Sequence, residues 1–114
     1  MRRQEFWSFI GAGGKSTLLL LTAEKYAREG RRVLVTTTTH TAFRGEQLKK
    51  AGGTLLLGND GAAAAALLQQ ISPVAAVREL PGEGGKQKGL SEPELGRAMA
   101  AAELVLAEAD GSRG

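Results

Sequence analysis

Short apolar runs alternate with helix-favouring segments along this chain, a pattern typical of α/β proteins. Residues 5–10 (EFWSFI) predict a strand that ends at a group of glycines beginning with Gly11. Residues 15–29 are rich in helix-forming side chains, and Gly30 suits the position just after a helix. The run RVLVTT at 32–37 is β-branched and apolar, as expected for a strand buried on both faces.

The second half of the chain continues this alternation with shorter elements. Ser91-Glu92-Pro93-Glu94 has the form of a capping box and predicts a helix that reaches about Ala101. The segment Pro81 to Gly89, which contains Gly84-Gly85-Lys86, lacks periodicity and predicts a mobile loop. The remaining expected elements are a helix at 44–51, strands at 54–57, 74–77 and 103–108, and a helix at 62–70 that Asn59-Asp60-Gly61 caps.

Strands that alternate with helices predict a three-layer α/β fold, with a mostly parallel sheet and helices on both faces. The 114 residues are expected to form a single domain, 1–114. The chain stops at Ser112-Arg113-Gly114, directly after a predicted strand, so we expect the domain to be truncated at its C-terminus. Ligands of such sheets bind at the carboxyl ends of the strands, so we expect the functional site there.

Composition narrows the classes of function. The chain has no cysteine, which excludes a disulfide framework, a thiolate zinc site and a cysteine nucleophile. Fifteen basic and twelve acidic side chains give a net charge of +3, which favours anionic ligands but is too mild to indicate nucleic acid. No apolar run approaches the roughly 18 residues of a membrane span, and the N-terminus lacks a signal-peptide pattern. We therefore expect a cytoplasmic protein with no membrane partner.

The strongest functional signal is Gly11-Ala12-Gly13-Gly14-Lys15-Ser16-Thr17, between a predicted strand and a predicted helix. Glycine lets backbone N–H groups approach a phosphate closely, and a helix N-terminus adds partial positive charge. Lys15 suits the β- and γ-phosphates, and the Ser16 hydroxyl suits Mg²⁺. The full G-x-x-x-x-G-K-[ST] pattern needs glycine where this chain has Phe9, so the loop is a shortened variant of the type in ATP-dependent amide ligases. The expected ligand is ATP or GTP with Mg²⁺.

Two other interpretations of this segment remain open. One is a glycine-rich turn followed by an amphipathic helix with an exposed lysine. The other is a dinucleotide fingerprint, because Gly11, Gly13 and Ser16 follow its spacing with two of its three glycines. That fingerprint needs an acidic residue about 20 positions later, where this chain has threonines at 36–39.

Polar residues follow two further predicted strands. Glu108 and Asp110 end the last strand on one face, and a phosphate loop needs such an acid on a neighbouring strand for Mg²⁺ or its water shell. Thr38, Thr39 and His40 end the second strand, where they could position water, Mg²⁺ or a second substrate. The alternatives are an ordinary Asp-Gly turn and ordinary strand threonines with a surface histidine.

The strings FIGAGGKST, VLVTTTTH and VLAEADGSRG, in this order, resemble the YqeC family of selenium-dependent molybdenum hydroxylase accessory proteins. The resemblance implies a P-loop-type nucleotide-binding protein that acts in maturation of the hydroxylase cofactor, with the hydroxylase or its maturation machinery as partner. It implies phosphate and Mg²⁺ binding by the glycine loop with Lys15 and Ser16, and an acidic-edge motif of Glu108, Asp110 and Arg113. Thr38, Thr39 and His40 would be site residues of unassigned role. Family members continue beyond this motif.

We carry three functional hypotheses from the sequence. The first is an NTP-binding enzyme or NTPase that serves cofactor maturation, with Lys15, Glu108 and Asp110 as catalytic residues and Ser16, Glu108 and Asp110 at the metal. The second is a ligase-like or kinase-like transferase in which ATP activates a small-molecule substrate. The third is a non-catalytic switch that holds nucleotide. A nucleic-acid partner is not expected, because the basic residues are scattered.

Overall fold

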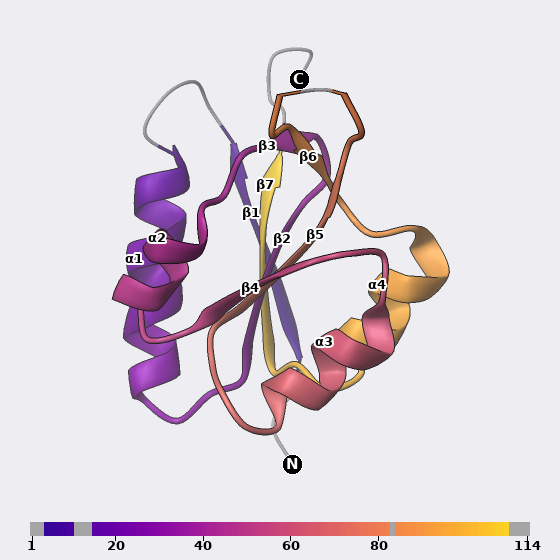
Figure 1. Ribbon diagram of the computed structural model, residues 1–114. Helices are drawn as coiled ribbons and strands as arrows, with labels where there is room; N and C mark the ends of the chain where they lie inside the picture. The colour runs from indigo at the N-terminus through magenta and orange to yellow at the C-terminus, as the bar shows by residue number, and fades with distance from the viewer. Residues whose placement is uncertain (1–3, 11–14, 83, 110–114) are drawn as a thin grey trace.

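The computed structural model describes residues 4–10, 15–82 and 84–109, with Lys15 and Ser16 described by their backbone. Helices follow strands through most of this part of the chain, as the hydrophobic pattern predicts (Figure 1). In order, its elements are β1 (Glu5–Ile10), α1 (Lys15–Arg28), β2 (Val33–Thr37), β3 (His40–Thr41), α2 (Gly45–Lys50), β4 (Thr54–Leu57), α3 (Gly61–Leu68), β5 (Val74–Glu79), β6 (Gln87–Lys88), α4 (Glu92–Met99) and β7 (Leu104–Ala109).

The sheet is mixed. Its main part is parallel, with neighbours in the order β1-β7-β2-β5-β4. The last residues of β5 then pair antiparallel with β6, and β6 pairs antiparallel with β3. The prediction of a mostly parallel sheet is therefore confirmed, whereas these antiparallel pairs were not predicted.

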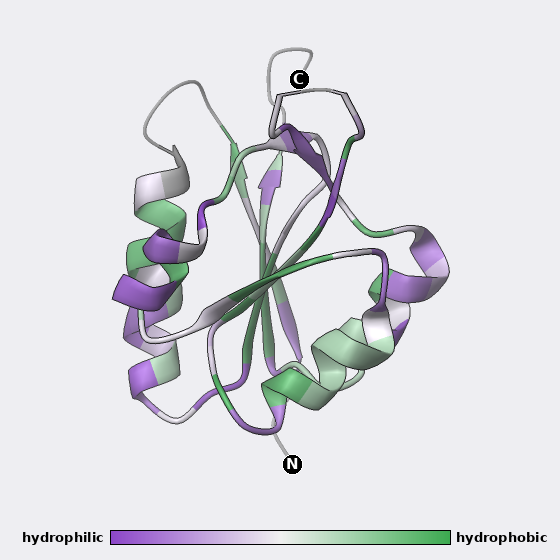
Figure 2. Cartoon of the chain, viewed as in Figure 1, coloured by the Kyte–Doolittle hydropathy of each residue, from purple (hydrophilic) through white to green (hydrophobic). Residues whose placement is uncertain are grey.

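Helices cover both faces of the sheet, which gives the predicted three layers. Figure 1 shows α1 and α2 on one side of the sheet and α3 and α4 on the other. Each face of the sheet carries its own cluster of buried apolar side chains, and successive residues of a central strand belong to opposite clusters. Val33 and Val35 of β2 pack on the α1–α2 side, and Leu34 packs on the α3–α4 side. This two-sided burial explains the continuous apolar strands, which are green in Figure 2.

Strand β1 is an edge strand that pairs with β7 alone among the described strands. After Phe6 its residues alternate between half-buried and exposed, because Trp7 and Phe9 on one face pack against the apolar cluster on the α1–α2 side. Trp7 anchors that face through an edge-to-face contact with Tyr26 of α1, with ring centroids 5.3 Å apart. This contact joins the middle of β1 to the last turn of α1.

Three local predictions from the sequence were wrong. The segment from Pro81 to Gly89 is not entirely a loop, because Gln87 and Lys88 form β6. Ser91 does not cap α4 with its side chain, and Glu94 instead accepts a hydrogen bond from the backbone N–H of Gly61 at 2.8 Å. The polar pattern of a capping box thus serves a contact between two helices. The helix itself ends at Met99, two residues before the predicted end.

Helix α3 begins as the sequence predicts. Asp60 is its N-cap, and the Asp60 side chain accepts a hydrogen bond from the N–H of Ala63 at 3.0 Å. Within the described residues, no helix combines the length and the apolar character needed to cross a membrane.

Candidate functional site

The carboxyl ends of three adjacent parallel strands meet at one edge of the sheet. Ile10, the last residue of β1, pairs with Ala109 of β7, and Thr37, the last residue of β2, pairs with Glu108. Helix α1 begins only five positions after Ile10, at Lys15. Strand β1 therefore ends at this edge, and α1 begins five positions later in the sequence. The sequence analysis predicts the site at this edge.

Several predicted site residues lie outside the described part of the chain. They are Gly11, Ala12, Gly13, Gly14, Asp110 and Arg113. Lys15 and Ser16 form the first two residues of α1, as predicted, and Thr17 follows them with an exposed side chain. The backbone thus places the Lys-Ser-Thr segment at a helix N-terminus, where a partial positive charge favours an anion.

Glu108 lies at the centre of this edge. It is flanked in register by Phe9 of β1 and Thr37 of β2, and only 3% of its surface is exposed. Strand alternation places Glu108 on the same face as Leu104 and Leu106, which is the face that α1 and α2 cover. A carboxylate is costly to bury, so the burial of Glu108 at the carboxyl edge makes it a candidate functional residue.

The first threonines of the run at 36–39 join neighbouring strands, a role that the sequence analysis did not predict. Thr36 and Thr37 are buried, and their hydroxyls donate hydrogen bonds to the carbonyl oxygens of Ala76 (3.1 Å) and Glu108 (3.0 Å). The Thr38 N–H also donates to the Glu108 carbonyl, at 2.8 Å. These hydroxyls tie β2 to both of its neighbours near the carboxyl edge.

The predicted site residues Thr38, Thr39 and His40 do not end the second strand, because β2 stops at Thr37. The Thr39 N–H donates to the Thr37 hydroxyl at 3.1 Å, which turns the chain. His40 then enters β3 and pairs with Lys88 of β6. Thr38 and His40 are exposed and remain near the edge. The buried first part of the run therefore joins strands, whereas Thr38 and His40 are accessible to a ligand.

Two polar residues near this edge were missed by the sequence analysis. Gln87 is buried, and its amide makes two hydrogen bonds to the backbone of Phe43. Arg78 at the end of β5 is half-buried, and its Nε donates to the Gly89 carbonyl at 2.7 Å. A single glutamine in a glycine-rich segment carries no periodic signal, and both residues bind backbone groups of other segments. The sequence alone therefore could not reveal these contacts.

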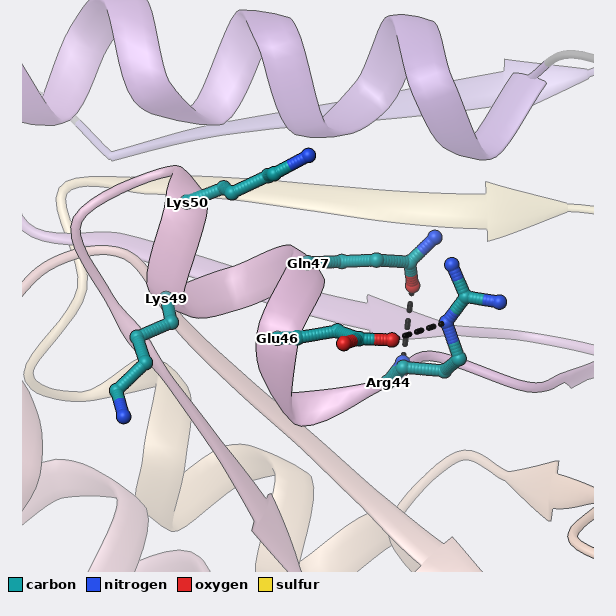
Figure 3. Close-up of a pocket in the computed structure, with 5 residues that line it drawn as sticks. All are labelled: Arg44, Glu46, Gln47, Lys49 and Lys50. Carbon is teal, nitrogen blue, oxygen red and sulfur yellow. Dashed lines mark hydrogen bonds and ion pairs between the residues drawn. The ribbon is translucent and has the colours of Figure 1, made fainter.

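Two cavities lie beside α2 and share Gln47 and Lys50 as lining residues. One, of about 490 Å³, is lined by Arg44, Glu46, Gln47, Lys49 and Lys50 (Figure 3). The other, of about 390 Å³, lies between α1 and α2. Thr17 is the predicted site residue that lines it, and Figure 3 shows the Lys50 side chain directed toward α1. The cavity between α1 and α2 therefore lies next to the start of α1.

Among the residues that the structure describes, no group of three or more His, Cys, Asp and Glu side chains could hold a metal. Mg²⁺ bound with a nucleotide uses only one or two protein side chains, because phosphates and water supply the other oxygens. Glu108 is a predicted Mg²⁺ ligand that the structure places at the carboxyl edge, and Ser16 and Asp110 are the other predicted ligands.

Sequence comparison decides the family. The profile of the family described as "YqeC protein" matches residues 7–114. The chain belongs to the YqeC family. The match covers every predicted site residue, including the glycine loop and Arg113.

A curated YqeC relative matches over a shorter stretch. The chain is 54% identical over 39 residues to the uncharacterized protein YqeC of Escherichia coli strain K12. This alignment covers 34% of the chain and 15% of the E. coli protein, well under two thirds of that relative. No solved structure matches the chain.

Proposed function

We propose that this YqeC-family chain binds a nucleoside triphosphate, ATP or GTP, with Mg²⁺ at the carboxyl edge of a P-loop-type sheet. One observation carries the proposal: the register places the end of β1, five positions before the start of α1, directly beside the carboxylate-bearing end of β7. A phosphate loop requires this order, with the acid on the strand next to the loop. The glycine-rich sequence of residues 11–14 supplies the expected chemistry.

Each residue has a distinct task in this proposal. The backbone N–H groups of the glycine loop and the N-terminus of α1 bind the phosphates, and Lys15 neutralises their charge. Glu108 and Asp110, with the Ser16 hydroxyl, hold Mg²⁺. The bound ion supplies charge neutralisation and orientation of the phosphates. The buried surroundings of Glu108 strengthen its electrostatic effect, because few waters screen it.

We further propose that nucleotide binding serves maturation of the cofactor of selenium-dependent molybdenum hydroxylases, in the cytoplasm. The resemblance of FIGAGGKST, VLVTTTTH and VLAEADGSRG to YqeC proteins supports this role. Membership of the YqeC family over residues 7–114 supports the resemblance itself. The partner would be the hydroxylase or its maturation machinery.

A transferase is the second candidate, in which the nucleotide activates a small molecule as in ligases or kinases. The exposed side chains of Thr38 and His40 favour it, because they lie near the strand ends where a second substrate would meet the nucleotide. Product analysis separates the candidates. Free phosphate alone indicates an NTPase, a phosphorylated or ligated product indicates a transferase, and binding without turnover indicates a switch.

The test is a calorimetric titration with ATP and GTP, with Mg²⁺ and with EDTA. We expect Lys15→Ala to weaken nucleotide binding by about tenfold or more, since a charge-assisted contact contributes about 1.5–3 kcal/mol. Lys25→Ala is the matched control, because Lys25 lies in the same helix and pairs with Glu29 at 3.0 Å. Equal nucleotide affinity in the wild type and in a folded Lys15→Ala variant would refute the proposal.

A further inference from the structure

Three basic side chains form a row across the antiparallel part of the sheet. Lys88 of β6 pairs with Arg78 of β5 on one side and with His40 of β3 on the other. Paired residues of antiparallel strands lie on the same face, with Cβ atoms about 5 Å apart. We call Arg78, Lys88 and His40 the basic row.

Within the described part of the chain, the basic row takes part in no ion pair. The neighbouring registered set, Glu79, Gln87 and Thr41, lies on the opposite face because side chains alternate along each strand. Arg78 and Lys88 are like charges directly opposite each other, an arrangement that destabilises a sheet and that a bound anion would stabilise.

The strands that carry the row are held firmly in place. The Arg78 Nε donates to the Gly89 carbonyl at 2.7 Å, which fixes the base of its guanidinium group. Gly89 lies against β2, since a Cβ on Gly89 would be 2.2 Å from the Thr37 carbonyl oxygen. On the other face, the Gln87 amide binds both backbone polar groups of Phe43. An anion would therefore meet side chains on a preorganised backbone.

The basic row also lies next to the carboxyl edge. The Thr38 N–H donates to the Glu108 carbonyl at 2.8 Å, and His40 follows only two positions later. Two residues of chain span at most about 7 Å, so His40 is close to the end of β7. Figure 1 shows β3 and β6 at the same end of the sheet as the arrowheads of β1 and β7.

We infer that the basic row binds the oxyanion, a phosphate or carboxylate group, of a small second ligand beside the strand ends. Arg78 offers a planar fork for two oxygens, Lys88 offers a point charge, and His40 offers a ring N–H. The row is short and has no exposed aromatic side chain in it, which favours a small molecule over a nucleic-acid strand. This site is separate from the glycine loop and does not depend on nucleotide binding there.

The single histidine of the sequence makes the test specific, because one imidazole C2–H resonance reports on the row. Inorganic phosphate and succinate are titrated separately at constant pH and ionic strength, and the His40 resonance is followed by NMR. We expect a saturable shift with at least one of the two anions. Phosphate alone identifies a phosphorylated ligand, succinate alone a carboxylate, and both together a general oxyanion site; each result supports the inference.

Three variants separate the row from other causes. Lys88→Gln should weaken the anion affinity by about tenfold, a change of about 1.4 kcal/mol. Lys86→Gln removes the same charge from an exposed residue outside the row and should leave the affinity unchanged. Lys15→Ala should also retain the His40 response, whether or not nucleotide binds at the glycine loop.

Several results would overturn the inference. They are a non-saturable response to both anions, an unchanged affinity in Lys88→Gln, and a response that Lys15→Ala abolishes. A single-stranded oligonucleotide that shifts the resonance at tenfold lower concentration than either small anion would instead assign the row to nucleic acid. The backbone amide spectrum of each variant confirms that it is folded.

Discussion

The buried side chain of Gln87 binds both backbone polar groups of Phe43. Its Oε1 accepts a hydrogen bond from the Phe43 N–H at 2.6 Å, and its Nε2 donates to the Phe43 carbonyl at 2.8 Å. The glutamine thereby replaces a strand neighbour for the segment between β3 and α2. It also satisfies two polar groups beside a phenylalanine that is only 3% exposed.

Loss of this amide should therefore destabilise the protein. Gln87→Ala leaves the Phe43 N–H and carbonyl without partners, and we expect the free energy of unfolding to fall by about 2–3 kcal/mol. Chemical denaturation measures the change. Lys86→Ala is the control, because Lys86 is exposed, lies outside β6 and should alter stability by no more than about 0.5 kcal/mol. Equal stabilities of the two variants would contradict this role of Gln87.

Two glycines should respond in opposite ways to alanine. Gly89→Ala would place a Cβ 2.2 Å from the Thr37 carbonyl oxygen, so β6 must move away from β2 and stability should fall. Gly96 of α4 has open space around its Cβ position, and Gly96→Ala should raise the free energy of unfolding by about 1 kcal/mol. Thermal melts of both variants provide the comparison. A stable Gly89→Ala variant would show that β6 is not pressed against β2.

The caps of the two helices on the α3–α4 side should differ in energy. Asp60→Ala removes the acceptor for the Ala63 N–H and should cost about 1 kcal/mol, whereas Asp60→Asn should retain most of the stability. Ser91→Ala should cost less, because the Ser91 side chain does not cap its own helix. Denaturant titrations of the three variants test this order. A larger loss in Ser91→Ala would restore the capping box that the sequence suggested.

Glu108 should determine the Mg²⁺ dependence of nucleotide binding. Glu108→Gln keeps the shape of the side chain but removes the charge that favours Mg²⁺, so the ratio of nucleotide affinities with Mg²⁺ and with EDTA should fall by about tenfold. Calorimetry measures both affinities. Glu92→Gln removes a carboxylate from the exposed start of α4 and should leave the ratio unchanged. The same ratio in Glu108→Gln as in the wild type would exclude Glu108 as a metal ligand.

Local patterning explains why most elements were predictable. The observed bounds of β1 and β4 equal the predicted ones, because a glycine directly follows each apolar run and marks its end. The strands β3 and β6 were missed, since two residues are too few for a periodic signal. They pair only because tertiary contacts of Gln87 and Gly89 hold them in place.

The candidate site also has features that the sequence predicts and features that only the structure reveals. The sequence predicted the Lys-Ser-Thr start of α1 and the acidic end of the last strand. It could not distinguish the buried Thr36 and Thr37, which join strands, from the exposed Thr38 and His40. Four consecutive threonines look alike in a sequence, and burial alone separates their roles.

The sequence by itself determined the alternation of strands and helices, the glycine-rich segment before α1 and the chemistry available at the strand ends. Only the tertiary structure decided that β7 lies between β1 and β2, so that Glu108 is flanked by Phe9 and Thr37. It also decided that Arg78, Lys88 and His40 share one row. The physical reason is that hydrophobic periodicity depends on neighbours along the chain, whereas the order of strands depends on how both faces of the sheet are covered.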